Sequence, residues 1–196
     1  MPRSTRPAAA ALLLASVLAT SACTGSAGAG TGDPVSPRLQ GVGGLASGVF
    51  PVGQRRPAPD LLGQTLEGGR LDVGALRGQV VVLNFWASWC APCRAEAVNL
   101  NAVATQTKPM GVAFVGINIR DDDTAARAFQ RNHAVPYPSL VDQAGALLLK
   151  FRGQAPQSPP TTLVLDRQGR VAARFLQPVT EAELLAPVQA IAAEQA

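Results

Sequence analysis

Residues 80–96, VVVLNFWASWCAPCRAE, determine the fold that this sequence predicts. The unbroken β-branched and apolar run, which follows a glycine, is typical of a strand buried on both faces, as in a parallel sheet. The residues after Cys90 are mostly helix formers, and Pro92 is tolerated because it falls in the first helical turn. We therefore expect a strand and then a helix over residues 91–107. Cys90 and Cys93 would lie at the carboxyl end of the strand, where open α/β sheets place their chemistry.

Cys90 is expected to cap the N-terminus of this helix. Free N–H groups and the positive end of the helix dipole favour a thiolate there, and such positions lower cysteine pKa values from about 8.5 to about 3.5–7.5. An accessible thiol of low pKa beside a second thiol is suited to thiol–disulfide exchange. Cys90 would be the attacking nucleophile, and Cys93, one turn further and more buried, the resolving thiol. The alternatives are a static disulfide or half of a zinc site; zinc needs further ligands, and the chain offers only Cys23 and one histidine besides.

The segment NFWASWCAPCRAE resembles the active-site segment of the thioredoxin superfamily, and in detail that of its TlpA/ResA branch of membrane-tethered bacterial thiol–disulfide oxidoreductases. Asn84 lies where cytosolic thioredoxins carry a buried aspartate, which favours the extracytoplasmic branch. The resemblance covers residues 57–194. It implies an α/β, thioredoxin-like fold, with a central mixed sheet flanked by helices, an N-terminal hairpin and a helix–strand insertion over residues 124–141.

The hydrophobic pattern of the remaining chain predicts further elements. A second buried strand over residues 111–119 follows the helix, and this strand–helix–strand spacing predicts a parallel, right-handed crossover. Two strands joined by a short turn at residues 166–169 must be antiparallel. The other predicted elements are a hairpin with a Glu-Gly-Gly turn within 58–79, a short strand at 137–141, a short helix at 144–151, and a C-terminal helix at 180–193 that opens with a capping box of Thr180 and Glu183.

Glu96 is a third candidate catalytic residue. It follows Cys93 by three positions and shares that cysteine's helix face, where it is placed to take or give the proton that Cys93 exchanges. It also matches the acidic residue of the CxPCxxE motif of ResA-like proteins, which implies that it tunes the active-site pair. Burial near a thiol would raise the pKa of its carboxyl. The alternative is an ordinary exposed helix glutamate.

The resemblance implies three residues that bind the partner. Pro160, in the segment SPPTT, corresponds to the cis-proline that faces the CxxC pair in thioredoxin-like folds. The residue before it normally offers its backbone N–H and C=O to an extended partner peptide, but here it is Pro159, which has no N–H to donate. Trp89, next to the nucleophile, is expected to shape the partner surface.

The N-terminal part of the chain is predicted to export and tether the domain. Residues 1–22 contain two arginines, an apolar run too short to span a membrane, and small residues before Cys23, a secretory signal pattern. Its end resembles the lipobox of bacterial lipoproteins, which implies lipidation of Cys23; the alternative is an ordinary cleaved signal with Cys23 free. Residues 23–56 are rich in glycine and are interpreted as a flexible, lipid-anchored linker, although 41–52 is apolar enough to pack on the domain predicted at 57–196.

Composition argues against other classes of function. The formal net charge is only +4, and there is no basic cluster with interleaved aromatics, so no nucleic-acid partner is predicted. Asp121, Asp122 and Asp123 are explained as acids at a helix N-terminus rather than as metal ligands. His133 is the only histidine; it cannot build a triad and is expected to be a helix-terminal or packed residue. We predict no metal and no cofactor beyond the redox-active pair of cysteines.

The resemblance implies an enzyme on the outer face of a bacterial cell membrane that exchanges disulfides with protein thiols. Within that branch, proteins with WCxPCRxE look like reductants of apocytochrome c, recharged by a membrane thiol carrier. An oxidant or isomerase for exported proteins is the first alternative. A peroxidase is disfavoured because Ala87 replaces the hydroxyl residue that peroxiredoxins carry three positions before their cysteine. A non-enzymatic lipoprotein that holds a metal through CxxC is the last alternative.

Overall fold

The computed structural model describes residues 41–42 and 45–195, so the predicted signal segment, Cys23 and most of the predicted linker lie outside the described residues. Within them, no helix has the length and apolarity that a membrane crossing requires. The strands are β1 (Gly41–Val42), β2 (Leu45–Ala46), β3 (Gly48–Val49), β4 (Leu62–Gln64), β5 (Arg70–Asp72), β6 (Val80–Trp86), β7 (Val112–Ile119), β8 (Ser139–Asp142), β9 (Thr161–Leu165) and β10 (Val171–Phe175). The α-helices are α1 (Ala91–Thr107), α2 (Asp123–Asn132), α3 (Ala146–Lys150) and α4 (Glu181–Ala193).

Six strands form one mixed sheet in the order β3-β10-β9-β6-β7-β8. Strands β6, β7 and β8 are parallel neighbours, whereas β9 and β10 run antiparallel to the strands beside them. Strand β6 lies inside the sheet, and all seven of its residues are buried, as its unbroken apolar run predicted. The predicted thioredoxin-like architecture, a mixed sheet flanked by helices, is confirmed.

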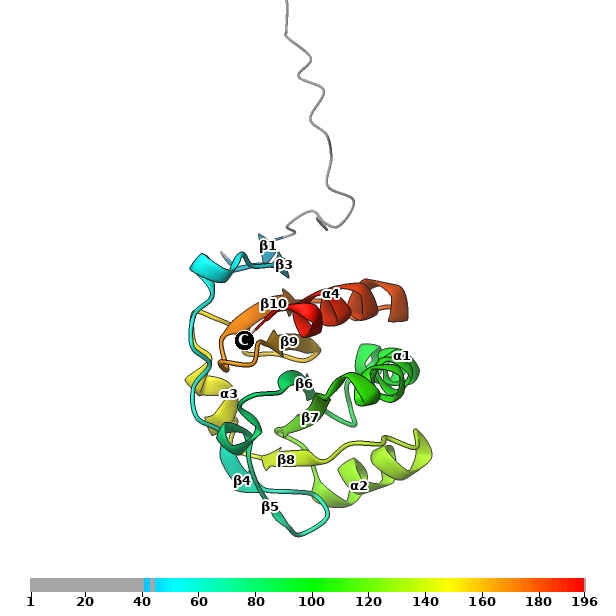
Figure 1. Cartoon of the computed structure of the whole chain (residues 1–196). Helices are drawn as coiled ribbons and strands as arrows, with labels where there is room; N and C mark the ends of the chain where they lie inside the picture. The colour runs from blue at the N-terminus through cyan, green and yellow to red at the C-terminus, as the bar shows by residue number, and fades with distance from the viewer. Residues whose placement is uncertain (1–40, 43–44, 196) are drawn as a thin grey trace, which may run out of the picture. The chain divides into compact units, whose positions relative to one another are not determined.

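Helices cover both faces of this sheet (Figure 1). Helices α1, α2 and α4 lie on one side, while α3 and the β4–β5 hairpin lie on the other. Alternate residues of β6 point to opposite faces of the sheet. Val80 and Val82 pack with residues of α1 and α4, whereas Val81 and Leu83 pack with residues of α3. The next residue on the α1 side is Asn84, a polar residue that strand alternation therefore directs at the redox helix.

The predicted hairpin at residues 58–79 is present as β4 and β5, which pair antiparallel outside the main sheet. Its turn contains Gly68 at φ +89°, a left-handed conformation that favours glycine. The amide of Leu66 in this turn donates to the carbonyl of Ser139 on β8 over 2.9 Å. The hairpin is thereby fastened to the edge strand of the sheet.

The main sheet begins upstream of the predicted domain start at residue 57. Strand β3 pairs antiparallel with β10, and the amide of Phe50 donates to Ala172 over 2.7 Å. Arg55 follows with an almost buried side chain that is paired with Asp166. Part of the predicted linker is therefore the edge of the sheet. The sequence analysis allowed residues 41–52 to pack on the domain but predicted no strand there, because a two-residue edge strand is held by backbone hydrogen bonds and needs no hydrophobic pattern.

Candidate redox site

Cys90 and Cys93 form a disulfide at the first turn of α1, with their Cα atoms 5.3 Å apart. Cys90 is the N-cap residue of the helix, and its Sγ accepts a hydrogen bond from the backbone N–H of Cys93 over 3.2 Å. Because α1 follows β6 after a loop of four residues, both sulfurs lie beyond the carboxyl end of a buried central strand. The predicted placement of the pair at the start of the helix is confirmed. An N–H of the first helical turn, which has no acceptor within the helix, points at the Cys90 sulfur.

Both cysteines are buried in this disulfide form: Cys90 is 4% exposed and Cys93 is 2% exposed. We expected an accessible Cys90 and a more buried Cys93. In the disulfide form the two cysteines are instead buried to almost the same extent. They share an apolar cluster with Leu66 from the hairpin and with Trp86 and Phe129, whose rings lie 4.4 Å apart. The side chains that cover Cys90 come from three separate parts of the chain, which the local sequence around the CxxC pair does not reveal.

Glu96 lies on the buried face of α1 and is only 1% exposed, so it is not an ordinary surface glutamate. Its Oε1 accepts from Asn84 Nδ2 over 3.0 Å, and its Oε2 accepts from the backbone N–H of Val179 over 3.2 Å. Loss of hydration raises the pKa of this carboxyl from 4.5 to about 7, although the two hydrogen bonds act in the opposite direction. A buried acid that titrates near neutral pH is thus set one helical turn after Cys93.

Two further residues extend the polar cluster around Glu96. Asn84 also donates to Thr162 Oγ1 on β9 over 3.1 Å, which fixes the orientation of its amide. Burial raises the pKa of the Tyr137 hydroxyl, and the charge of Glu96 raises it further. Tyr137 was not predicted as part of the site, because it precedes β8 and is far from the CxxC pair in sequence.

Trp89 is 56% exposed beside the disulfide, and its role in shaping a partner surface stays a prediction. Its indole Nε1–H donates to the carbonyl of Arg120 over 3.0 Å. The adjacent Asp121 accepts hydrogen bonds from both the backbone N–H and the hydroxyl of Ser88. The loop before the disulfide is therefore held by a turn after β7 that the sequence analysis did not assign to the site.

The peptide bond between Pro159 and Pro160 is cis, in agreement with the resemblance. Pro160 is followed at once by β9, whose first residue, Thr161, pairs with Phe85 near the end of β6. The two prolines therefore lie near the carboxyl end of β6, at the same end of the sheet as the loop that leads to the disulfide. The partner-binding role expected for these residues remains a prediction.

The other residues considered as ligands have structural partners. Asp122 caps α2 by accepting from the backbone amides of Thr124 and Ala125, and Asp123 pairs with Arg127 over 3.3 Å. His133 is the C-cap of α2 and packs on Phe129. No group of three or more histidine, cysteine, aspartate or glutamate residues that suits a metal occurs within residues 45–195.

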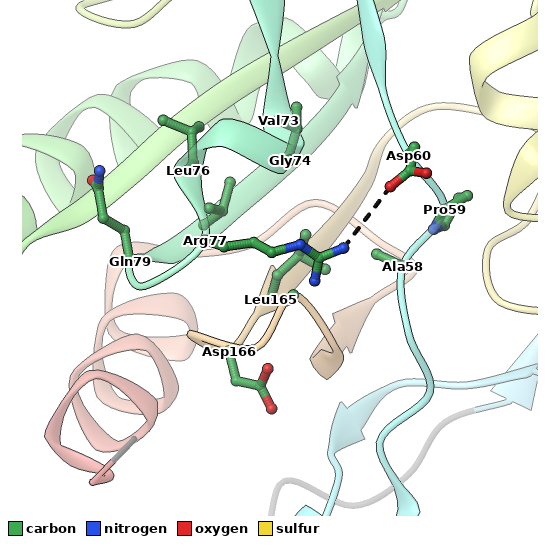
Figure 2. Close-up of a pocket in the computed structure, with 12 residues that line it drawn as sticks. Ala58, Pro59, Asp60, Val73, Gly74, Leu76, Arg77, Gln79, Leu165 and Asp166 are labelled. Atoms are coloured by element: carbon green, nitrogen blue, oxygen red, sulfur yellow. Dashed lines mark ion pairs between the residues drawn. The ribbon is translucent and has the colours of Figure 1, made fainter.

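A small hollow lies near the start of β6, at the other end of that strand from the disulfide (Figure 2). Its volume is about 20 Å³, room for roughly one water molecule. Arg77 crosses it toward Asp60, 3.8 Å away. Neither cysteine lines this hollow, so it is not part of the redox site.

A CxxC disulfide at the start of a helix, after the central strand of a mixed sheet, defines a thioredoxin-like thiol–disulfide oxidoreductase. The chain belongs to the Redoxin family, which it matches over residues 51–188. Thiol-disulfide oxidoreductase ResA of Bacillus thuringiensis is 28% identical over 129 residues, which cover 66% of this chain and 73% of that protein. Thiol:disulfide interchange protein HelX of Rhodobacter capsulatus is 34% identical over 130 residues, 66% and 70% of the two chains.

Solved structures show the same likeness. A secreted thiol-disulfide isomerase from Corynebacterium glutamicum is 32% identical, with a TM-score of 0.71 over 74% of this chain and 91% of that one. A DsbF homologue from Corynebacterium diphtheriae is 32% identical, with a TM-score of 0.67 over 79% and 99%.

Proposed function

We propose that this protein is an exported reductant of protein disulfides that uses Cys90 and Cys93 as its dithiol. The observation that carries the exchange chemistry is the Cys93 N–H directed at Cys90 Sγ over 3.2 Å, because a donor in that position favours the thiolate of Cys90 over its thiol. A stabilised thiolate serves exchange in either direction, so the reducing direction is proposed from the WCxPCRxE motif and the likeness to ResA and HelX. The exposed indole of Trp89 beside this sulfur supports a protein as the partner, since it offers an apolar surface next to the reacting bond.

The exchange proceeds in two displacements. The Cys90 thiolate attacks one sulfur of the partner's disulfide, so that a mixed disulfide forms and one partner thiolate leaves. The Cys93 thiol then loses its proton and attacks Cys90 Sγ, which closes the Cys90–Cys93 disulfide and releases the second partner thiolate. Two electrons pass to the partner, and a membrane thiol carrier would return them by the same exchange.

Glu96 is the base proposed for the second displacement. Its carboxyl has a pKa of about 7, so it holds or releases a proton at neutral pH, and it lies on the same buried helix face as Cys93. Proton transfer through Glu96 would spare Cys93 the cost of ionising without a base in an apolar cluster.

Reduction of apocytochrome c during cytochrome maturation is the proposed physiological role, on the strength of the WCxPCRxE motif and the likeness to ResA and HelX. The second candidate is an oxidant or isomerase for exported proteins, which the likeness to a secreted thiol-disulfide isomerase favours. Export with lipidation at Cys23 is part of the proposal. A Cys23→Ser chain should then leave the membrane fraction.

The reduction potential of the purified chain, equilibrated against defined thiol buffers, distinguishes these roles. A value at or below about −250 mV supports the reductant, and one of about −120 to −180 mV supports the oxidant or isomerase. A disulfide-closed peptide with a CxxCH segment serves as the cytochrome probe. The Cys93→Ser variant should trap it as a mixed disulfide, whereas a Cys90→Ser variant should trap nothing.

A further inference from the structure

We infer that Asp121 is a positioning residue that holds Trp89 and the loop before Cys90 as a docking platform for the protein partner. The inference deepens the proposed function and rests on it, because a docking platform matters only if the cysteine pair exchanges disulfides with proteins. Asp121 lies in the turn between β7 and α2, and more than thirty residues of sequence separate it from the loop that it contacts.

The Asp121 carboxylate accepts four hydrogen bonds from the described residues. Oδ1 accepts from the hydroxyl of Ser88 over 2.7 Å and from the backbone N–H of Asp122 over 2.9 Å. Oδ2 accepts from the backbone N–H of Ser88 and from Asn118 Nδ2, the latter over 2.8 Å. Four donors around two oxygens favour a carboxylate. An asparagine at this position would turn its N–H₂ group toward at least one backbone N–H or amide donor, whichever way its amide was oriented.

Asn118 shows how strongly this arrangement is specified. It is fully buried at the end of β7, with its Nδ2 directed at Asp121. Its Oδ1 has no hydrogen-bond partner among the described residues. A flipped amide would direct that oxygen at the carboxylate, so the charge of Asp121 fixes the orientation of Asn118 at the expense of a buried acceptor.

The backbone beside Asp121 holds the tryptophan itself. Arg120 has φ +48°, an uncommon conformation for a residue other than glycine, and its carbonyl accepts from the indole of Trp89. The guanidinium of Arg120 donates to the carbonyl of Gln157, two residues before the cis Pro159–Pro160 bond. One turn therefore connects the loop before the disulfide with the segment before the prolines, the two stretches that the resemblance assigns to partner binding.

Cys90 does not depend on this turn for its own position. Its backbone N–H donates to Ala87 over 3.1 Å, its carbonyl accepts from Arg94 over 3.2 Å, and its sulfur accepts from Cys93. Loosening the Asp121 contacts should thus disturb docking at Trp89 more than the chemistry at Cys90. The predicted signature is a higher KM for a protein disulfide at nearly constant kcat.

The experiment compares Asp121→Asn with Asp123→Asn in the full chain. Asp123 lies two residues away, and its replacement removes the same charge. Among the described side chains, its hydrogen-bond partners are Arg127 and Gln143. With insulin as the protein disulfide, Asp121→Asn should raise KM at least tenfold and change kcat less than threefold. Turnover of a small disulfide, oxidised glutathione, should stay within twofold, and Asp123→Asn should match the unchanged chain throughout.

Hydrogen exchange at the Trp89 indole N–H and the Ser88 amide reports on the platform directly. Both should exchange at least tenfold faster in Asp121→Asn. Ser88→Ala loses only the hydrogen bond of the hydroxyl, so it should give a smaller increase in KM and in both exchange rates. This variant replaces Asp121→Asn in the test if Asp121→Asn does not fold. Unchanged KM and unchanged exchange in these variants would overturn the inference. An unchanged chain that does not reduce insulin would instead refute the proposed function, while the exchange rates would still report whether Asp121 holds the loop.

Discussion

The side-chain amide of Asn84 donates a hydrogen bond to Glu96 Oε1 over 3.0 Å, which joins the strand that leads to the disulfide with the helix that follows it. Both residues are almost fully buried. The contact lies on the α1 face of the sheet, where β6 otherwise presents the apolar residues Val80, Val82 and Trp86. The charged form of a carboxyl is less stable when buried with two neutral donors than when hydrated by water. Protonation of Glu96 is therefore linked to folding.

Replacing Glu96 by glutamine should remove a pH dependence of stability. The folded-state pKa of about 7 exceeds the ordinary value of 4.5, so the folded chain binds this proton more tightly than the unfolded chain. The stabilising contribution of protonated Glu96 is therefore complete below about pH 4.5 and is lost as the pH rises through about 7. The free energy of unfolding should fall by on the order of 3 kcal/mol over this range. Urea unfolding at pH 4.5, 6 and 8 would show this decline in the unchanged chain and not in Glu96→Gln.

The same substitution should alter the thiol chemistry. The pH profile of alkylation of the reduced chain should lose an inflection near pH 7 in Glu96→Gln, because the carboxyl no longer exchanges a proton with its surroundings. Glu181→Gln, an exposed change at the start of α4, is the control and should leave the profile unaltered. Identical profiles for the Glu96→Gln and unchanged chains would contradict the proposed role of Glu96.

Asn84→Asp should raise the apparent pKa at this site above 7. Two carboxyl groups would then share one buried contact, and they cannot both ionise there without strong repulsion, so they titrate as a pair. The variant should lose at least 2 kcal/mol of stability at pH 8 and recover most of it below pH 5, as followed by urea unfolding. Thr162→Ala removes the other partner of Asn84 and leaves Glu96 untouched, so its stability loss should not vary with pH.

Gly116→Ala tests the packing between β7 and β8. A Cβ at Gly116 would lie 2.1 Å from Ser139 Oγ and 2.7 Å from Trp86 Nε1, two atoms that are hydrogen-bonded to each other. We expect thermal unfolding to show a loss of about 1–3 kcal/mol, typical of an overpacked interior. Gly53→Ala, where a Cβ meets nothing within 4 Å, should stay within about 0.5 kcal/mol. Equal stabilities for the two variants would contradict the close approach at Gly116.

Arg55→Ala tests whether the segment before residue 57 belongs to the domain. The Arg55 guanidinium lies 3.2 Å from Asp166 Oδ2 and 2.6 Å from Glu194 Oε1, with both Arg55 and Asp166 nearly buried. Without Arg55, Asp166 keeps Arg170 as an ion-pair partner at 2.8 Å, and Glu194 is partly exposed, so neither carboxylate is left buried and unpaired. We therefore expect a loss of about 1–3 kcal/mol, which urea unfolding would detect. Arg56→Ala changes the neighbouring exposed arginine and should cost less than about 0.5 kcal/mol. If Arg55→Ala were as stable as the unchanged chain, the result would support the predicted domain start at residue 57.

The elements around the disulfide could be predicted because their signals are local. The apolar run of β6, the proline in the first turn of α1 and the capping box of Thr180 and Glu183 are each readable within a few residues. The spacing of Glu96 to Cys93 favoured a buried carboxyl over an exposed helix glutamate, and the residue is 1% exposed. The family and the exchange chemistry came from the same short stretch.

The rest depended on contacts between distant segments. Asp121, Asp122 and Asp123 are alike in sequence, yet one holds the redox loop, one caps α2 and one pairs on the surface. Strand β3 and Arg55 lie in a glycine-rich stretch whose partners are more than a hundred residues away. Their roles follow from three-dimensional proximity, which no periodicity in the chain encodes.

The edge strand and its arginine give the domain a mechanical attachment point. Tension applied to the chain from its N-terminal side would load the hydrogen bonds that Ala46 and Ser47 accept from Arg174 and Leu176, and then the β3–β10 hydrogen bonds at Gly48–Val49. It would next reach Arg55, which is paired with Asp166 and Glu194. Strands β10 and β9 separate this point from β6. Pulling on a tether would therefore strain one edge of the sheet and leave the geometry of the disulfide and of Trp89 undisturbed.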